Sequence, residues 1–273
     1  YLDGAIALKT GSQHFKYDAD YIKAIGNADI IIRSDFKAPV NVTNFFGFGN
    51  NTLIDLNSHN VQYYRARYNI INASAYLSYQ LQSWMRINIG PTFQYFRLDS
   101  TQNRNRFVSN TIINGLDHGT LFNPRHYIGG DVRLAINSRN NNIIPTRGLA
   151  LDAGIRQLFN WDGMPNRLTQ VNLDMRLFMS LFEWERLVLA TRFGWAKNYG
   201  AFQFPQAMYL GGTDNLRGYR KQRFAGRSLV YNNTELRIRV ANFSTYLFGG
   251  IFGIQIFNDI GRVFMDGQKS NKW

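Results

Sequence analysis

The sequence predicts an all-β protein, specifically a transmembrane antiparallel β-barrel. Polar and apolar residues alternate along most of the 273 residues, with the two-residue period of a strand. Aromatic residues make up 15% of the chain, although its mean hydropathy is −0.30. This combination is typical of barrels whose strands face lipid and water alternately and whose rims carry aromatic girdles. No run of 18 apolar residues occurs, so a bilayer would be crossed by strands rather than by a helix.

The alternation is clearest over residues 234–240 and recurs at 86–93, 131–136 and 170–177. In the first segment the charged residues fall on one strand face and the aliphatic residues on the other, namely Glu235, Arg237 and Arg239 against Leu236, Ile238 and Val240. A charged face on strand after strand needs water beside it, which lies outside a sandwich but inside a barrel. Several segments are about 10 to 16 residues long, which suits tilted membrane-spanning strands better than sandwich strands.

Thirteen strands are predicted within one barrel domain over residues 1–273. The first eleven lie near residues 2–9, 13–23, 27–37, 41–49, 60–68, 72–82, 84–98, 127–138, 146–160, 166–181 and 185–198, and the last two near 228–241 and 247–265. A long loop, about residues 201–227, separates the two groups. A second long connection, 99–125, is polar and Asn-rich, whereas short turns at 69–71 and at Ser83 are candidates for the periplasmic side.

An odd number of strands is unexpected, because single-chain bacterial barrels have an even number. An open edge in hydrocarbon would also leave unpaired backbone groups, each costing several kcal/mol. Residues 266–272 are polar and show no apolar alternation, and they are followed by a lone Trp273. We therefore expect about three closing strands to be missing from the C-terminal end.

Three motifs, in a fixed order, resemble those of the BamA/TamA-like outer-membrane assembly superfamily, also called the bacterial surface antigen family. Residues 211–219 read GGTDNLRGY and resemble the family's (V/L)RG(F/Y) loop signature. Residues 233–237 are similar to its N-x-E-x-R strand, and residues 257–261 to its F-x-D-x-G strand. Residues 44–51, NFFGFGNN, resemble a segment of family barrels from the Bacteroidetes. The resemblance implies sixteen strands in the full protein, with the loop after the eleventh.

The resemblance also implies that the loop folds back into the lumen and is pinned there. A guanidinium in a lumen loses part of its hydration, so it needs a carboxylate and preferably an aromatic face. Arg217 is expected to pair with Asp259, which shares its strand face with Phe257 and Gly261, while Gly218 would permit a turn closed to other residues. The expected site comprises the loop residues Leu216, Arg217, Gly218 and Tyr219 and the wall residues Glu235, Phe257, Asp259 and Gly261.

No catalytic, metal or cofactor site is recognisable. The chain has no Cys, and its four His residues are isolated from one another, without a paired-ligand spacing. No G-x-S-x-G elbow occurs; a Ser, His and Asn site on the outer wall is the enzymatic alternative that remains. The net charge of +13 is scattered at alternate strand positions, which favours lumen and lipid-headgroup contacts over nucleic-acid binding.

The resemblance implies a Gram-negative outer-membrane protein that inserts other barrel proteins or moves polypeptide across the membrane. Its expected partners are outer-membrane lipid including lipopolysaccharide, unfolded outer-membrane or secreted polypeptides, and accessory lipoproteins. One alternative is a C-terminal anchoring barrel behind a patatin-like or phosphoesterase domain, and another is a diffusion porin. Periplasmic POTRA repeats upstream would favour assembly, whereas a porin is disfavoured because the inward loop would occlude its pore.

Overall fold

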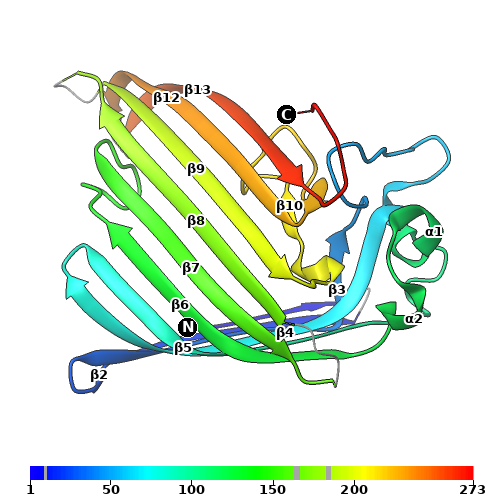
Figure 1. Cartoon of the computed structure of the whole chain (residues 1–273). Coiled ribbons are helices and arrows are strands. Elements are labelled where there is room, and N and C mark those ends of the chain that lie inside the picture. The colour runs from blue at the N-terminus through cyan, green and yellow to red at the C-terminus, as the bar shows by residue number, and fades with distance from the viewer. Residues whose placement is uncertain (9–10, 163–166, 183–185, 273) are drawn as a thin grey trace.

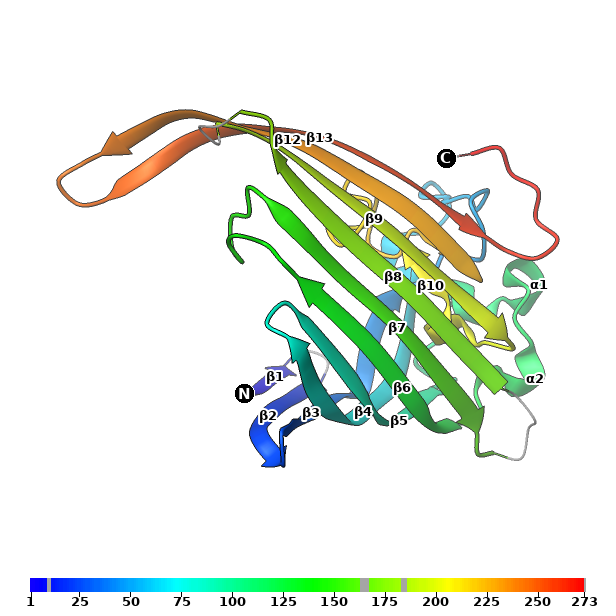
Figure 2. The same cartoon turned by 60° about the vertical axis from the view of Figure 1, so that its left-hand side comes forward.

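The computed structural model describes residues 1–8, 11–162, 167–182 and 186–272. Eleven of its strands form one continuous antiparallel sheet, which curls around a central space, and β10 and β11 form a separate hairpin (Figures 1 and 2). The strands of the sheet are β1 (Leu2–Ala7), β2 (Ser12–Ile25), β3 (Ala28–Asn44), β4 (Arg65–Gln82), β5 (Met85–Leu98), β6 (Arg125–Asn137), β7 (Gly148–Asn160), β8 (Arg167–Ser180), β9 (Leu187–Gly200), β12 (Ser228–Ser244) and β13 (Gly249–Phe264). The predicted all-β, antiparallel class is confirmed.

The sheet has eleven strands rather than thirteen, because two pairs of predicted strands are each continuous. β3 includes the predicted segment 27–37 and the start of 41–49, and β4 includes 72–82 and the end of 60–68. The predicted strand residues 45–49 and 60–64 lie instead at the two ends of the connection between β3 and β4, where 61–64 form η1. The β3–β4 ladder shifts register between residues 37 and 41 but does not end there. A β-bulge interrupts the alternation without reversing the chain, so the turn predicted at 69–71 was wrong. Nine strands of the sheet, not eleven, therefore precede the loop 201–227.

The two faces of the sheet are divided by polarity. Asp259 on β13 lies opposite Asn233 on β12, which lies opposite Arg192 on β9, and Arg192 lies opposite Arg176 on β8. This row of polar side chains lines the inside of the curled sheet. The alternate positions carry exposed apolar side chains on the outside, such as Ile155, Ile254 and Ile256. The polarity is therefore that of a barrel, with lipid outside and water inside, as the alternation predicted.

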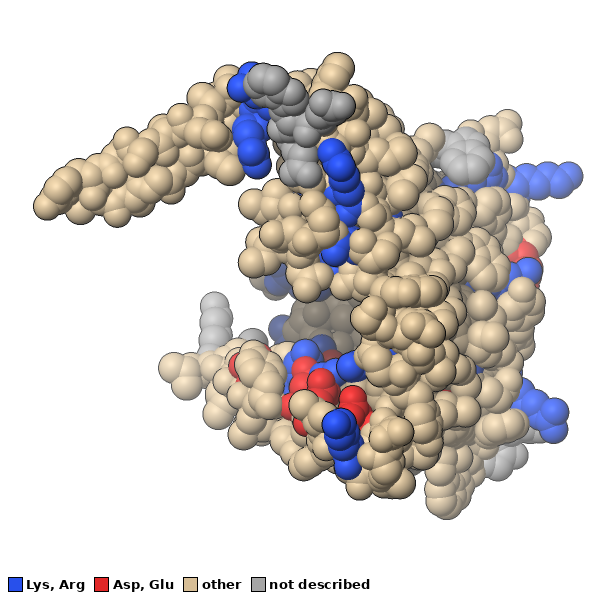
Figure 3. Space-filling model, turned by 90° about the vertical axis from the view of Figure 1, so that its left-hand side faces the viewer, with Lys and Arg blue, Asp and Glu red and all other residues tan. Residues whose placement is uncertain are grey.

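The two ends of the barrel differ in their connections. The connections 45–64, 99–124 and 201–227 share one end, called here the long-loop end, and 26–27, 83–84, 138–147 and 245–248 share the other, the short-turn end. Aromatic rings from the long connections pack together at the long-loop end, with centroid distances of 5.1 to 5.9 Å between neighbours such as Phe45, Phe107 and Phe204. Figure 3 looks onto the short-turn end, where the molecule is hollowed and charged side chains surround the opening.

The helical segments all lie in the long connections. They are η1 (Val61–Tyr64), η2 (Phe107–Ser109), α1 (Thr111–Asn114), α2 (His118–Leu121) and η3 (Phe204–Gln206). Within the described ranges, no helix is both long and apolar enough to cross a membrane.

The division of faces predicts opposite outcomes for neighbouring substitutions on β8. Leu173 faces outward near the middle of the strand, and Asn172 faces the lumen and is exposed there. Leu173→Arg places a charge in hydrocarbon and should cost about 2–4 kcal/mol of unfolding free energy, whereas Asn172→Arg should be nearly neutral. Urea unfolding of both variants in lipid vesicles measures the difference. Equal destabilisation by the two substitutions would contradict the assignment of faces.

Candidate functional site

The loop 201–227 turns back along the inner face of the barrel. It contains η3, β10 (Met208–Leu210) and β11 (Phe224–Gly226) before the chain enters β12. Leu210 is fully buried and packs with the inward side chains of Leu229, Tyr231 and Val263. The β10–β11 hairpin therefore lies on the wall formed by β9, β12 and β13 rather than projecting into solvent.

Arg217, at the tip of this loop, makes a set of charge-assisted hydrogen bonds to the wall. Its Nε and Nη2 donate to the two oxygens of Asp259 at 2.8 and 2.6 Å, and its Nη1 donates to Glu235 at 2.7 Å. Its backbone N–H also donates to Asp259, at 3.0 Å. Such a two-pronged pairing of guanidinium and carboxylate fixes orientation as well as position. The hydrogen bonds to Asp259, followed by those to Glu235, raise the pKa of Arg217, so it remains charged.

An aromatic face and two further side chains complete the anchor. The ring centroid of Phe257 lies 3.9 Å from the guanidinium carbon of Arg217, within the range of a cation–π contact. Asn233 donates to Asp259 and to the loop carbonyl of Asn215, both at 2.8 Å, and Arg237 donates to Glu235 at 2.7 Å. Asn233 and Arg237 are absent from the site expected from sequence. They belong to the same N-x-E-x-R strand and share the face of Glu235, and this was the signal that could have identified them.

The other expected residues divide between the anchor and its surroundings. Leu216 is buried beside it. Gly261 lies under the hairpin, where an added Cβ would stand 3.2 Å from a methyl of Leu210 and 3.0 Å from Cβ of Tyr231, so its missing side chain lets β10 approach the wall. Tyr219 is half exposed, and its ring packs edge-on against Phe224 rather than in the Arg217 cluster.

The expectation for Gly218 was wrong. Its φ is not in the left-handed region, and nothing lies within 4 Å of an added Cβ. The glycines that the turn requires are Gly211 and Gly212, with φ of 120° and 91°. A Cβ on Gly211 would also meet the carbonyl oxygen of Arg220 at 2.2 Å. The turn that requires glycine is therefore at Gly211 and Gly212, at the start of the motif, and not at Gly218 beside Arg217.

The connection between β3 and β4 holds the loop from its other side. Asn44 donates to the carbonyl of Lys221 at 2.9 Å, and the N–H of Gly49 donates to the carbonyl of Ala225 at 2.7 Å. Arg223 donates to the hydroxyl of Thr52 at 2.6 Å. These contacts join segments about 170 residues apart in the chain. The segment 44–51 carried a family-like pattern, but the pattern did not reveal its contact with the loop.

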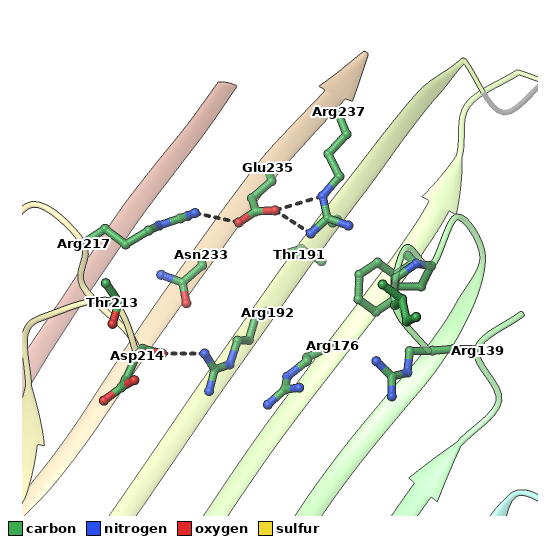
Figure 4. A pocket seen from close by; sticks show the side chains of 14 residues that line it. Arg139, Arg176, Thr191, Arg192, Thr213, Asp214, Arg217, Asn233, Glu235 and Arg237 are labelled. Carbon is green, nitrogen blue, oxygen red and sulfur yellow. Dashed lines mark hydrogen bonds and ion pairs between the residues drawn. The ribbon is translucent and has the colours of Figure 1, made fainter. Parts of the chain in front are cut away.

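The contacts of this site hold the loop in position on the wall. Among the described residues, no group of three or more His, Cys, Asp and Glu side chains is placed to hold a metal ion. Arg192 on β9 donates to the carbonyl of Asp214, and Arg217 donates to Glu235 on β12 (Figure 4). With the bonds from Arg217 to Asp259 on β13, the loop tip is attached to all three strands. The loop thus ties three adjacent strands together from inside the lumen.

The family model described as the Omp85 superfamily domain matches residues 5–273. The chain belongs to the Omp85 superfamily. A solved structure with the same fold is the crystal structure of BamA from Haemophilus ducreyi lacking POTRA domains 1–3, which matches with a TM-score of 0.65 at 14% sequence identity. The match covers 93% of this chain and 50% of the BamA chain, so this chain spans about half the length of that structure. No curated protein matches the chain.

Membership of the Omp85 superfamily confirms the resemblance found in the motifs, the barrel class and the location in the outer membrane. Outer-membrane barrels have short periplasmic turns and longer extracellular loops. The long-loop end of this Omp85 barrel is therefore assigned to the cell surface and its short-turn end to the periplasm.

The anchor predicts that Arg217→Ala loosens the loop. Asp259 has a side chain only 5% exposed, and the substitution leaves its charge without a cation. Breaking a fully buried pair costs about 3–5 kcal/mol; a loss of roughly 2 kcal/mol is expected here, because the lumen is hydrated. Limited proteolysis should cut 201–227 faster in this variant. The matched control is Arg220→Ala in the same loop, whose side chain is exposed; unchanged cleavage in Arg217→Ala would count decisively against the anchor.

The glycines of the motif give a second, independent prediction. Gly211→Ala should cost about 1–3 kcal/mol, because a side chain is strained in that backbone conformation. Gly218→Ala should change stability by less than about 0.5 kcal/mol, since its surroundings are open. Thermal unfolding of the two variants in the same detergent compares them. A larger loss of stability from Gly218→Ala than from Gly211→Ala would contradict this assignment and favour the turn at Gly218 expected from sequence.

Proposed function

We propose that this Omp85 barrel inserts other outer-membrane proteins into the bilayer or moves polypeptide across it. The observation that carries the proposal is the anchored loop tip, in which Arg217 bonds to Asp259 and Glu235 on the inner wall. A loop bonded to the inner wall narrows the lumen and would hinder a diffusion channel. A wall that must stay rigid while another part of the barrel opens does gain from it.

The physical task of insertion explains why such a brace is useful. A strand entering hydrocarbon must pair its backbone N–H and C=O groups, and a sheet edge can supply the partners. Opening a barrel at one edge removes the ring closure that holds its strands in place. The loop bonds to β9, β12 and β13 together, so these strands would keep their register while another edge opens.

The proposed partners follow from this role. They are unfolded outer-membrane or secreted polypeptides as clients, accessory lipoproteins, and the surrounding lipid including lipopolysaccharide. We propose that POTRA repeats accompany the barrel, because the BamA from Haemophilus ducreyi that shares this fold is a protein with POTRA domains. The alternative is a patatin-like or phosphoesterase domain upstream. In both arrangements we propose that the barrel itself is not catalytic.

The porin alternative is opposed by the packing at the long-loop end. Phe45, Phe46 and Phe204 are each at most 2% exposed in an aromatic cluster supplied by the long connections. A closed cluster of this kind would hinder diffusion through the barrel. High and steady single-channel conductance of the full-length protein in planar bilayers would nevertheless favour a porin.

The test is the folding of a small urea-unfolded barrel protein into liposomes that hold the full-length protein. Heat-modifiable gel mobility reports the folded fraction of this client. The wild type should speed client folding over empty liposomes, and Arg217→Ala should slow it several-fold. Arg220→Ala, the matched control, should behave as the wild type. Client folding at the same rate with and without the wild-type protein would rule the proposal out.

A further inference from the structure

A cavity of about 640 Å³ lies inside the barrel between the loop tip and the inner wall (Figure 4). Three elements form it: the wall of β8, β9 and β12, the tip of the loop at residues 213–217, and the connection 138–147 from the short-turn end. Among the residues that the structure describes, five arginines and two carboxylates, those of Asp214 and Glu235, line it. The arginines are Arg139, Arg176, Arg192, Arg217 and Arg237.

Two of these arginines are forced together by the ladder. Arg176 and Arg192 lie directly opposite each other on β8 and β9, a pairing that repels unless a counter-charge intervenes. Asp174 supplies it, accepting from Nε of Arg176 at 2.9 Å and from Nε of Arg192 at 2.8 Å. One carboxylate thus serves two guanidinium groups. Within the described residues, the two terminal nitrogens of Arg176 make no hydrogen bond.

Two more arginines that line this cavity have N–H donors without a partner among the described residues. Arg237 uses Nε and Nη2 on Glu235, and Arg139 uses Nε and Nη2 on the side chains of Asn137 and Asn142. Each keeps its Nη1 without a partner among the residues that the structure describes. The free N–H groups come from β8, β12 and the connection 138–147, so they approach the cavity from three elements.

A second cavity in the same lumen lacks this excess. It measures about 520 Å³ and is lined by four cations, Lys16, Arg33, Arg133 and Arg156, and three carboxylates, Asp18, Asp35 and Asp152. Three ion-pair partners lie just outside this lining: Asp131 pairs with Arg133 and Arg156, Asp20 with Arg33, and Lys37 with Asp35. With them, five cations are matched by five carboxylates among the described residues. Around the first cavity, when Asp174 and Asp259 are counted as well, five described cations face four described carboxylates. An excess of positive charge among these residues favours an anionic ligand.

We propose that the first cavity binds a phosphate group through the unspent donors of Arg139, Arg176 and Arg237. A carboxylate is planar and is satisfied by one guanidinium, whereas donors of three arginines on different sides of one cavity suit a tetrahedral group with several oxygens. The volume is within the range of sites for small ligands. The phosphate belongs either to a soluble ester or to a phospholipid headgroup. Arg192 links this cavity to the loop through the carbonyl of Asp214, so an occupied site contacts the brace.

The site goes beyond the proposed insertion activity and is tested by binding alone. Full-length protein in phosphatidylcholine nanodiscs is titrated with glycerol 3-phosphate by calorimetry, and the titration is repeated in phosphatidylglycerol nanodiscs. Equal binding in both assigns the site to a soluble ester. Binding that phosphatidylglycerol abolishes assigns it to a lipid headgroup. Absence of binding in both kinds of nanodisc overturns the proposal.

The variant pair is Arg176→Gln and Arg133→Gln. Both arginines bond to an aspartate that also serves a second arginine and a tyrosine, Asp174 with Tyr231 and Asp131 with Tyr76. Only Arg176 lines the proposed site. Arg176→Gln should weaken binding by about tenfold or more, the effect of losing a hydrogen bond to a charged group, and Arg133→Gln should leave it unchanged. Equal weakening by both variants would show general lumen charge rather than a site.

A measurement on the wild type covers the case in which Arg176→Gln does not fold. An arginine-specific dicarbonyl reagent is applied with and without glycerol 3-phosphate, and modified peptides are quantified by mass spectrometry. The ligand should protect Arg139, Arg176 and Arg237 several-fold while Arg133 reacts at the same rate. In the headgroup case, phosphatidylglycerol gives the same protection. Uniform protection of all four, or protection of none, contradicts the assignment.

Discussion

Hydrocarbon offers no partner for a charged or polar group, and this constraint underlies the whole structure. Each strand must present apolar side chains to lipid at every second position, so its charged side chains are confined to the lumen. There they can be satisfied only by water and by one another. Asp131 accepts from Arg133, Arg156 and Tyr76, and Asp174 is bonded in the same way by Arg176, Arg192 and Tyr231. The lumen is a network of shared carboxylates because the outside excludes charge.

The anchored loop extends that network to a segment that is not part of the sheet. Asp259 has its carboxylate almost fully buried and therefore needs a cation, which no strand supplies in the register of β13. Arg217 supplies it from the loop, and the stacking of Phe257 limits the directions from which the guanidinium can arrive. The ion pair that neutralises Asp259 also holds the loop in place. Because the loop bonds to β9, β12 and β13, it fixes the positions of these strands relative to one another. Support of this kind suits a wall that keeps its shape while a membrane protein is assembled beside it.

The two ends of the lumen are built differently. Rings from connections distant in sequence close the long-loop end, and the segment 44–51 binds the returning part of the loop there. The short-turn end is open, and its arginines keep donors that no described carboxylate uses. A polar ligand reaching the loop from the periplasmic side therefore meets positive charge before it meets the anchor. The tip of the loop is bonded to the wall, and its periplasmic side is exposed to ligands that enter the lumen.

Several features followed from the sequence by itself. The two-residue period divides the side chains into two sets, because neighbours in a strand point to opposite sides. Segment length then favoured a barrel, in which the apolar set faces lipid. The order of the loop and strand motifs was sufficient to expect the pairing of Arg217 with Asp259, and the structure brings the two together. Strand boundaries were harder to predict from the sequence, because a bulge and a turn both interrupt the two-residue period. Only the pairing with a neighbouring strand distinguishes a bulge from a turn. That ambiguity divided β3 and β4 in the prediction.

Tertiary structure alone decided the rest. Asn233 joined the anchor because register places it opposite Asp259, and register is a relation between strands. Arg237 shares a face of β12 with Glu235, but only the structure shows that it bonds to that carboxylate. The glycines with positive φ proved to be Gly211 and Gly212 rather than Gly218, because backbone angles depend on where the loop must reverse to meet the wall. The clamp of segment 44–51 and the basic cavity join residues far apart in the chain. A sequence records which side of a strand a residue occupies, but which distant residue it meets is set only when the sheet curls and the loop returns into it.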